Sequence, residues 1–194
     1  MKSLKFPKTP QTPIQTPLQG SAMAKWRQMS TSDIPGLMRV ADEIHQDLPE
    51  SARVFLERVK LFPDGCLILE ENDSSEVCGY AISHPIRHRQ PPALDSLLGE
   101  ISPDVDQYYI HDVAVLPKFR GAGLAGECIN KLLTVAERYP TTCLVSVYGT
   151  ARFWGRFGFV ADPVDGPLAE KLRDYGPDAT YLSRENCRIG TGSQ

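Results

Sequence analysis

Residues 119–133 read FRGAGLAGECINKLL, a glycine-rich turn that leads into an amphipathic helix. Its glycines spell G-x-G-x-x-G, a pattern of dinucleotide-binding folds, where the glycines follow a strand directly and an acidic residue stands about 20 residues further on. Here the residues LPKFR separate the preceding strand from the glycines, and no carboxylate ends the following strand. A P-loop is excluded because Glu127 and Cys128 follow the last glycine instead of Lys and Ser or Thr. A helix entry without any ligand is a third alternative.

The residue before the glycines indicates a different anion site. Arg120, Gly123 and Ala125 form Arg-x-x-Gly-x-Ala at the start of a helix expected over 122–138. The first turn of a helix carries unpaired N–H groups and a partial positive charge, and small side chains let an anion approach them. The turn therefore predicts a pyrophosphate site that needs neither a metal nor a lysine.

A second motif follows at residues 151–160, which read ARFWGRFGFV. Together the two motifs resemble the GNAT acetyltransferase superfamily, whose pyrophosphate motif is Gln/Arg-x-x-Gly-x-Gly/Ala and whose next helix ends in Phe-Gly-Phe. The resemblance extends over about residues 25–185. Within the superfamily, YYIHDVAVLPKFRGAGLA is similar to the arylalkylamine and polyamine N-acetyltransferase branch.

Composition narrows the class of protein. The 194 residues include 41% hydrophobic and 23% charged residues, as in an ordinary globular domain, and the net charge of −3 gives no electrostatic reason to expect nucleic acid as a partner. No apolar run is long enough to span a membrane, and the start of the chain lacks the apolar core of a secretory signal. The five dispersed cysteines indicate free thiols, so we expect a cytoplasmic protein, and the histidines show no metal-ligand spacing.

Three segments are expected along the chain. Residues 1–22 form a Pro/Thr/Gln-rich tail that we expect to be disordered, residues 23–185 form the acetyltransferase domain, and residues 186–194 form a flexible tail. Hydrophobic periodicity predicts strands over 25–29, 66–71, 77–86, 108–116, 143–149 and 180–185, helices over 31–46, 50–62, 122–138, 150–158 and 168–175, and a helical turn over 93–98. The resemblance implies an α/β (α+β) GNAT fold: a mixed, mostly antiparallel sheet, flanked by helices and splayed between its fourth and fifth strands.

The resemblance also implies that acetyl-CoA, with no metal, fills the splay. The implied cofactor-binding residues are Val113, Ala114, Val115, Arg120, Gly121, Ala122, Gly123, Leu124, Ala125, Phe153 and Trp154. The acetyl group would pass directly to an amine, with no covalent enzyme intermediate.

The same strand supplies the candidate catalytic groups. Histidine as a residue type titrates near neutrality, so His111 is the candidate base, while Asp112 is an alternative base or an anchor for the amine. Strict alternation would place Tyr109, His111 and Val113 on one face, unless a bulge intervenes. The family often has a tyrosine as general acid where this chain has Trp154, which cannot donate a proton in that sense. Either the thiolate leaves unassisted, because thiols have a pKa of about 8.5, or Tyr148 is the acid.

The expected activity is transfer of an acetyl group from acetyl-CoA to a primary amine of a small molecule, of arylalkylamine or polyamine type. Tyr108, Tyr109 and Trp154 are the candidate substrate-binding residues, because aromatic rings can hold an aryl or ammonium group. The acidic connection 87–107 could attract a cation. A protein or peptide N-acetyltransferase and a non-catalytic acyl-CoA sensor are the alternatives, and a homodimer is left open.

Overall fold

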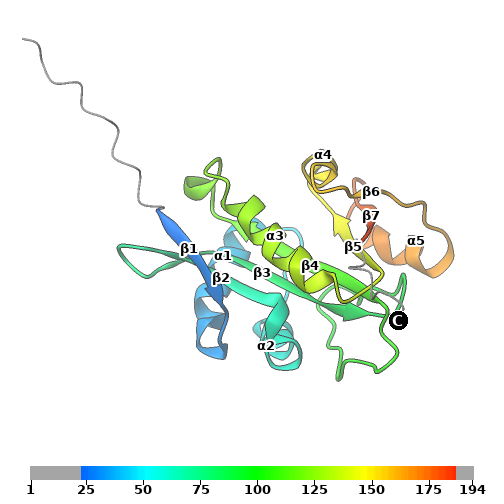
Figure 1. The fold of residues 1–194 in the computed structure, drawn as a ribbon, viewed down its shortest axis with the longest axis horizontal. Helices are drawn as coiled ribbons and strands as arrows, with labels where there is room; N and C mark the ends of the chain where they lie inside the picture. The colour runs from blue at the N-terminus through cyan, green and yellow to red at the C-terminus, as the bar shows by residue number, and fades with distance from the viewer. Residues whose placement is uncertain (1–22, 187–194) are drawn as a thin grey trace, which may run out of the picture.

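A mixed sheet of seven strands, in the order β1-β2-β3-β4-β5-β7-β6, organises the residues that the computed structural model describes, 23–186. Every neighbouring pair is antiparallel except β4 and β5, which are parallel. The strands are β1 (Ala24–Gln28), β2 (Cys66–Glu71), β3 (Val77–Ile86), β4 (Gln107–Val115), β5 (Thr141–Ser146), β6 (Val160–Ala161) and β7 (Thr180–Glu185), as drawn in Figure 1.

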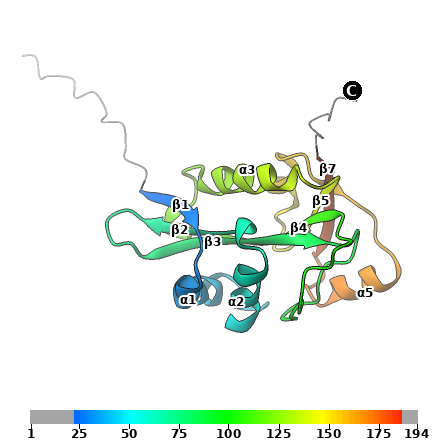
Figure 2. The same cartoon turned by 60° about the horizontal axis from the view of Figure 1, so that its bottom comes forward.

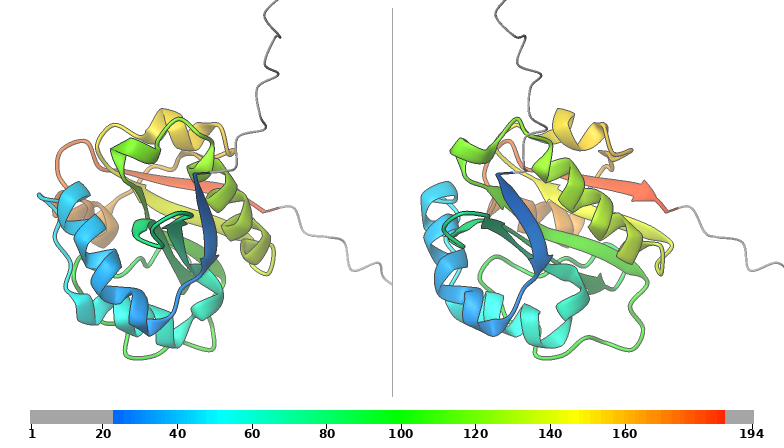
Figure 3. Two further views of the ribbon diagram at one scale, coloured as in Figure 1. Left: turned by 90° about the vertical axis from the view of Figure 1, so that its left-hand side faces the viewer. Right: turned by 60° about the vertical axis from the view of Figure 1, so that its left-hand side comes forward.

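Helices cover both faces of this sheet. They are α1 (Ile34–Ile44), α2 (Ala52–Leu61), α3 (Leu124–Ala136), α4 (Ala151–Gly155) and α5 (Gly166–Arg173), with short 3₁₀ turns at Thr31–Asp33, Pro63–Gly65 and Pro117–Phe119. Figure 2 shows α3 on one face and α1, α2 and α5 on the other, and Figure 3 shows the same layers from the β1 side. Each of the long helices buries one apolar stripe, as their amphipathic sequences predict.

The two parallel strands pair over only part of their length. The β4–β5 ladder runs from Gln107 opposite Thr141 to Ile110 opposite Leu144 and then stops. On its other side, β4 stays paired with β3 as far as Val115. The sheet therefore opens between β4 and β5 beyond Ile110, which confirms the expected splay.

A bulge in β4 changes which side chains face which helices. The register between β3 and β4 shifts so that Ile82 faces Asp112 while Ser83 faces Ile110, which leaves His111 as the extra residue. Tyr109 consequently packs on the α5 side of the sheet, and Ala114, beyond the bulge, packs on the same face against α1 and α2. The bulge that the sequence leaves open is therefore present, and strict alternation does not continue beyond Ile110.

Other differences from the sequence-based elements are local. No helix forms over 93–98, where the chain makes only turns, and β6 is a two-residue strand that the sequence did not indicate. β5 ends at Ser146, so Tyr148 lies in the turn that follows it. Asn186, expected in the flexible tail, is buried and bonds to Thr142. The tail expected over 1–22, the remainder of the C-terminal tail and Cys187 lie outside the described residues.

Two general properties follow from the described part of the chain. Its four cysteines are all free and buried. Between residues 23 and 186, no helix combines the length and the apolar character that crossing a bilayer requires.

Candidate active site

A cavity of about 840 Å³ opens where β4 and β5 part, and it has two chemically different ends. The end beside α3 and α4, which we call the glycine half, is lined by Arg120, Gly121, Gly123, Leu124, Ala125, Gly126, Thr150, Phe153, Trp154, Arg156 and Phe157. The end beneath α1, which we call the carboxylate half, is lined by Ile44, His45, Leu48, Glu50, Leu94, His111, Asp112, Tyr148 and Tyr175. Residues 113–115 of β4 line the middle, so one exposed strand edge joins the two halves.

The glycine half is built from backbone. Gly121 and Gly123 have φ of +84° and +82°, values that only glycine adopts without strain, and open space surrounds both. Gly123 caps α3 and no side chain caps the helix, so the N–H groups of its first turn are free to bind an anion. Arg120 donates a hydrogen bond from Nε to the carbonyl oxygen of Val115 at 2.8 Å, which ties the turn to the end of β4. Ala122 is exposed and does not line the cavity.

Aromatic side chains form the wall opposite this turn. The ring of Phe153 lies 5.4 Å from the rings of both Trp154 and Phe157, measured between centroids. The Arg156 guanidinium lies 4.7 Å from the centroid of Phe153. Trp154 is buried in the core and also lines the cavity.

A buried carboxylate and imidazole dominate the floor of the carboxylate half. Nε2 of His111 lies 2.6 Å from Oε2 of Glu50, and their side chains are only 4% and 7% exposed. Burial alone would raise the pKa of Glu50, but the charge and hydrogen bond of His111 and the N–H of Asp95 outweigh it, so that pKa is lowered. Nδ1 of His111 is buried without a hydrogen-bond partner among the described residues.

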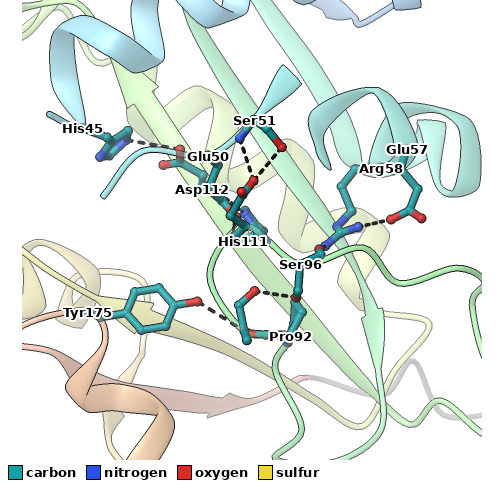
Figure 4. Close-up of polar contacts among 12 residues, drawn as sticks. His45, Glu50, Ser51, Glu57, Arg58, Pro92, Ser96, His111, Asp112 and Tyr175 are labelled. Carbon is teal, nitrogen blue, oxygen red and sulfur yellow. Dashed lines mark hydrogen bonds and ion pairs between the residues drawn. The ribbon is translucent and has the colours of Figure 1, made fainter. Parts of the chain in front are cut away.

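A second carboxylate lies beside the first. Oδ2 of Asp112 accepts a hydrogen bond of 2.5 Å from the Tyr80 hydroxyl and lies 3.2 Å from Nε2 of His45, as Figure 4 shows for the histidine. Burial opposes ionisation of Asp112, yet these partners lower its pKa. Burial would also lower the pKa of His45, but Asp112 raises it. The His45 ring stacks on Tyr148 with centroids 5.8 Å apart, and both rings line the cavity.

The structure separates the predicted substrate-binding tyrosines from the cavity. Tyr108 is fully buried, bonds through its hydroxyl to Ser83 at 2.6 Å and does not line the cavity. Tyr109 is also buried and packs beneath the His111 ring, edge to face, with centroids 5.7 Å apart. The two tyrosines lie in the core because β4 is a central strand, where aromatic side chains fill the core on both faces of the sheet. Trp154 and Tyr148 do line the cavity, and Tyr148 is 47% exposed with a left-handed φ of 54°.

Several lining residues had no signal in the sequence. They are His45, Glu50, Leu94, Arg156 and Tyr175. His45 and Glu50 flank the turn between α1 and α2, where isolated polar residues are ordinary surface residues in a sequence. Only the folding of this turn against β4 brings them to His111 and Asp112.

The pairing of His45 with Asp112 predicts a dependence of stability on pH. The folded state raises the pKa of His45 above its unfolded value of about 6.5, so the stabilisation is complete below that pH and is lost as the pH rises through the folded value. We expect the free energy of unfolding, from urea titrations at about pH 6 and about pH 9, to fall more in the wild type than in His45→Gln. The exposed His88→Gln variant is the control and should follow the wild type. Equal pH dependence in wild type and His45→Gln would contradict the pairing.

Comparisons with known proteins agree with this geometry. The sequence matches the family model described as "Acetyltransferase (GNAT) family" over residues 25–159, and a search of curated proteins finds no match. Ard1 from Thermoplasma volcanium is similar in structure with a TM-score of 0.62 at 17% identity, covering 84% of this chain and 97% of that one. Rv2747 from Mycobacterium tuberculosis, in complex with CoA and NLQ, gives 0.60 at 18% identity over 83% and 98%. The NatC complex bound to Gag peptide and CoA gives 0.61 at 16% identity over 84% and 98%.

At these identities the structures establish the fold alone, and they do not single out the arylalkylamine and polyamine branch. The family model spans most of the described residues, including both motifs from which the resemblance was inferred. The chain therefore belongs to the GNAT family of acetyltransferases and is an acyltransferase.

Proposed function

We propose that this protein transfers the acetyl group of acetyl-CoA directly to the primary amine of a small arylalkylamine. The observation that carries the proposal is the continuity of the cavity: a helix start without a side-chain cap and a pair of buried carboxylates open onto the same unpaired edge of β4. Two substrates that enter from the two halves would meet at residues 113–115. Holding them there supplies much of the rate, because a reaction between two bound groups avoids the entropy of a collision.

The glycine half suits the diphosphate of coenzyme A. The turn from Arg120 to Ala125 presents main-chain N–H groups and lacks side chains that would block an approach to them. The main chain of Val113 and Val115 has no partner on β5 and can bond to the amide groups of an extended arm, with Phe153 and Trp154 as its wall. When bound, acetyl-CoA supplies the reactive thioester carbonyl, and the free N–H groups of β4 are placed to stabilise charge that develops on its oxygen.

The carboxylate half suits an amine that must lose a proton. An alkylamine has a pKa near that of lysine, about 10, and arrives as an ammonium ion. Asp112, whose lowered pKa keeps it ionised, would attract the cation, and His111 would take the proton, since it lies on the floor of the same half. His111 is enclosed, so a water molecule would carry the proton to it.

Tyr148 is the proposed acid for the departing thiolate. Burial, together with Asp47 and Asp112, raises its pKa, which keeps the phenol protonated. Tyr148 lines the cavity and is largely exposed, and the turn after β5 holds it in a left-handed conformation. Trp154 cannot serve because an indole N–H is a donor without acidity in this range.

The lining of the carboxylate half selects among amines. Ile44, Leu48, Leu94 and Tyr175 offer apolar surface to a tail. Asp112 would bind the reacting ammonium, and Glu50 is engaged at both oxygens by His111 and the Asp95 N–H, so the second ammonium of a polyamine would find no free anion there. The described residues that line this half include no lysine or arginine, so an amine bearing a carboxylate would also lack a partner. A monoamine with an aromatic tail fits best.

A peptide N-terminus is the second candidate. The observation that favours it is the structural likeness to Ard1 and to the NatC complex, the latter bound to a Gag peptide. The rest of a peptide would have to fit beside Leu94 and Tyr175, which line the carboxylate half.

Turnover of acetyl-CoA with a set of acceptors tests the proposal. The set is tyramine, tryptamine, histamine, spermidine and a peptide with a free N-terminus and a lysine. We expect kcat/KM for tyramine and tryptamine to exceed that for spermidine about tenfold or more, because an unpaired buried charge is penalised. A higher kcat/KM for the peptide would favour the second candidate, and the absence of turnover with every acceptor would contradict both.

Replacement of Gly123 by alanine tests the diphosphate site. A residue with a side chain at φ +82° costs roughly 1–2 kcal/mol, so the turn should shift away from its present shape. We expect the Kd for CoA, measured by calorimetry, to rise about tenfold. Gly99→Ala introduces the same kind of strain at φ +73° outside the glycine half and should leave the Kd unchanged. Equal affinities in Gly123→Ala and wild type would remove the turn from the site.

Replacement of His111 by alanine tests the base. We expect kcat/KM at neutral pH to fall on the order of 10²-fold, and to recover as the pH approaches the amine's own pKa, because the free amine then needs no base. A pH–rate profile of the variant parallel to that of the wild type would assign the proton to another group, with Asp112 as the next candidate.

A further inference from the structure

The carboxylate of Glu50 is occupied at both oxygens. Oε2 lies 2.6 Å from Nε2 of His111, and Oε1 accepts the main-chain N–H of Asp95 at 2.9 Å. Glu50 stands in the turn between α1 and α2, whereas Asp95 belongs to the long connection between β3 and β4. In Figure 4 Glu50 lies over His111, next to Ser51. One side chain thus bridges the floor of the cavity and a segment far away in the sequence.

The attachment of Asp95 is reciprocal. Its Oδ1 accepts hydrogen bonds from the main-chain N–H of Ser51 at 2.7 Å and from the Ser51 hydroxyl at 2.6 Å. Asp95 itself has a left-handed φ of 52°, a conformation that these bonds and the N–H bond to Glu50 hold in place. Residues 50–51 and residue 95 therefore form a clasp with donors on both sides.

The clasp fixes a wall of the carboxylate half. Leu94, next to Asp95, lines the cavity, and we call residues 91–99 the wall segment. Outside the clasp, Arg58 donates to the Ser96 carbonyl at 2.7 Å and the Glu57 carboxylate accepts the N–H of Leu98 at 2.7 Å. The wall segment has no helix or strand of its own, so these side chains set its position.

The same carboxylate determines which nitrogen of His111 carries a proton. Ionised Glu50 can only accept, so Nε2 of His111 must be the donor. In the neutral ring the lone pair is then on Nδ1. The ring centroid of His84 is 6.0 Å from that of His111. Burial keeps the pKa of His84 far below its usual value, so His84 stays neutral and does not take a proton from His111.

We propose that Glu50 is a positioning residue that fixes the Nε2–H tautomer of His111. Because Glu50 also binds the main chain of Asp95, the wall segment and the His111 ring are positioned together. This inference rests on the proposed role of His111 as the base. It predicts that an acceptor which packs against Leu94 also stabilises the arrangement that can take its proton.

The test combines kinetics with ¹⁵N NMR of histidine-labelled full-length protein. The wild type should show a protonated Nε2 and an unprotonated Nδ1 for His111 in the neutral ring, with the signal assigned by its loss in His111→Ala. In Glu50→Gln the amide can donate to Nε2, so we expect the tautomers to mix or invert. We expect kcat to fall on the order of 10²-fold while the KM for acetyl-CoA stays unchanged, because Glu50 lies outside the glycine half.

The Asp95→Ala variant separates the effect of Glu50 on the His111 tautomer from its effect on the position of the wall segment. It keeps the Glu50 carboxylate and the main-chain N–H of residue 95 but removes both bonds from Ser51. We expect the KM for the amine to rise several-fold and the His111 signals to broaden. Asp104→Ala is the matched control: it removes an exposed ion pair with Arg87 in the same connection, and both readouts should match the wild type.

A proton on Nδ1 of His111 in the wild-type protein would overturn the inference, and that measurement needs no variant. Wild-type ¹⁵N shifts and kcat in a folded Glu50→Gln protein would overturn it as well. Should no amine be acetylated, the proposed function fails, but the NMR result still decides whether Glu50 sets the tautomer. A loss of thermal stability with unchanged shifts would reduce Glu50 to a structural role.

Discussion

The end of the β4–β5 ladder is the constraint on which the rest of this structure depends. Parallel strands buried between helices normally continue pairing, because a buried N–H or C=O without a partner is destabilising. Here the ladder stops at Ile110 and Leu144, although β4 continues to Val115. Apart from the Val115 carbonyl, which accepts a hydrogen bond from Arg120, the unpaired edge must find partners in solvent or in a ligand. A ligand with an extended amide chain can restore what β5 does not provide, which is why the cavity lies here.

The bulge at His111 is a second feature of β4 that shapes the site. An inserted residue shifts the alternation so that Asp112 and Ala114 face α1 and α2, while the His111 ring still reaches Glu50 beneath the turn between those helices. Two adjacent residues thereby direct their polar groups into one half of the cavity. In an unbulged strand they would point to opposite faces.

The sequence predicted those parts of the molecule that depend on local patterns. The amphipathic stripes of α1, α2 and α3, the strands around the hairpin and the glycine turn could all be found, because each is encoded within a few consecutive residues. The assignment of Tyr108 to the substrate site was wrong, because periodicity does not distinguish a strand face under a helix from one that lines a cavity. Glu50 and His45 could not be found, since their contacts with β4 join residues more than 60 positions apart.

The carboxylates of Glu50 and Asp112 are stable in the buried half of the cavity because hydrogen-bond donors surround them. Removing a carboxylate from water costs several kcal/mol unless partners compensate it. Glu50 is compensated by His111 and the Asp95 N–H, and Asp112 by Tyr80 and His45. Because these hydrogen-bonding partners are neutral donors or histidines, and the described residues that line this half include no lysine or arginine, the half stays receptive to an incoming ammonium ion. A permanent cation at either position would stabilise the carboxylate equally well but would repel the substrate, so histidine compensates the buried charge without closing the site to an amine.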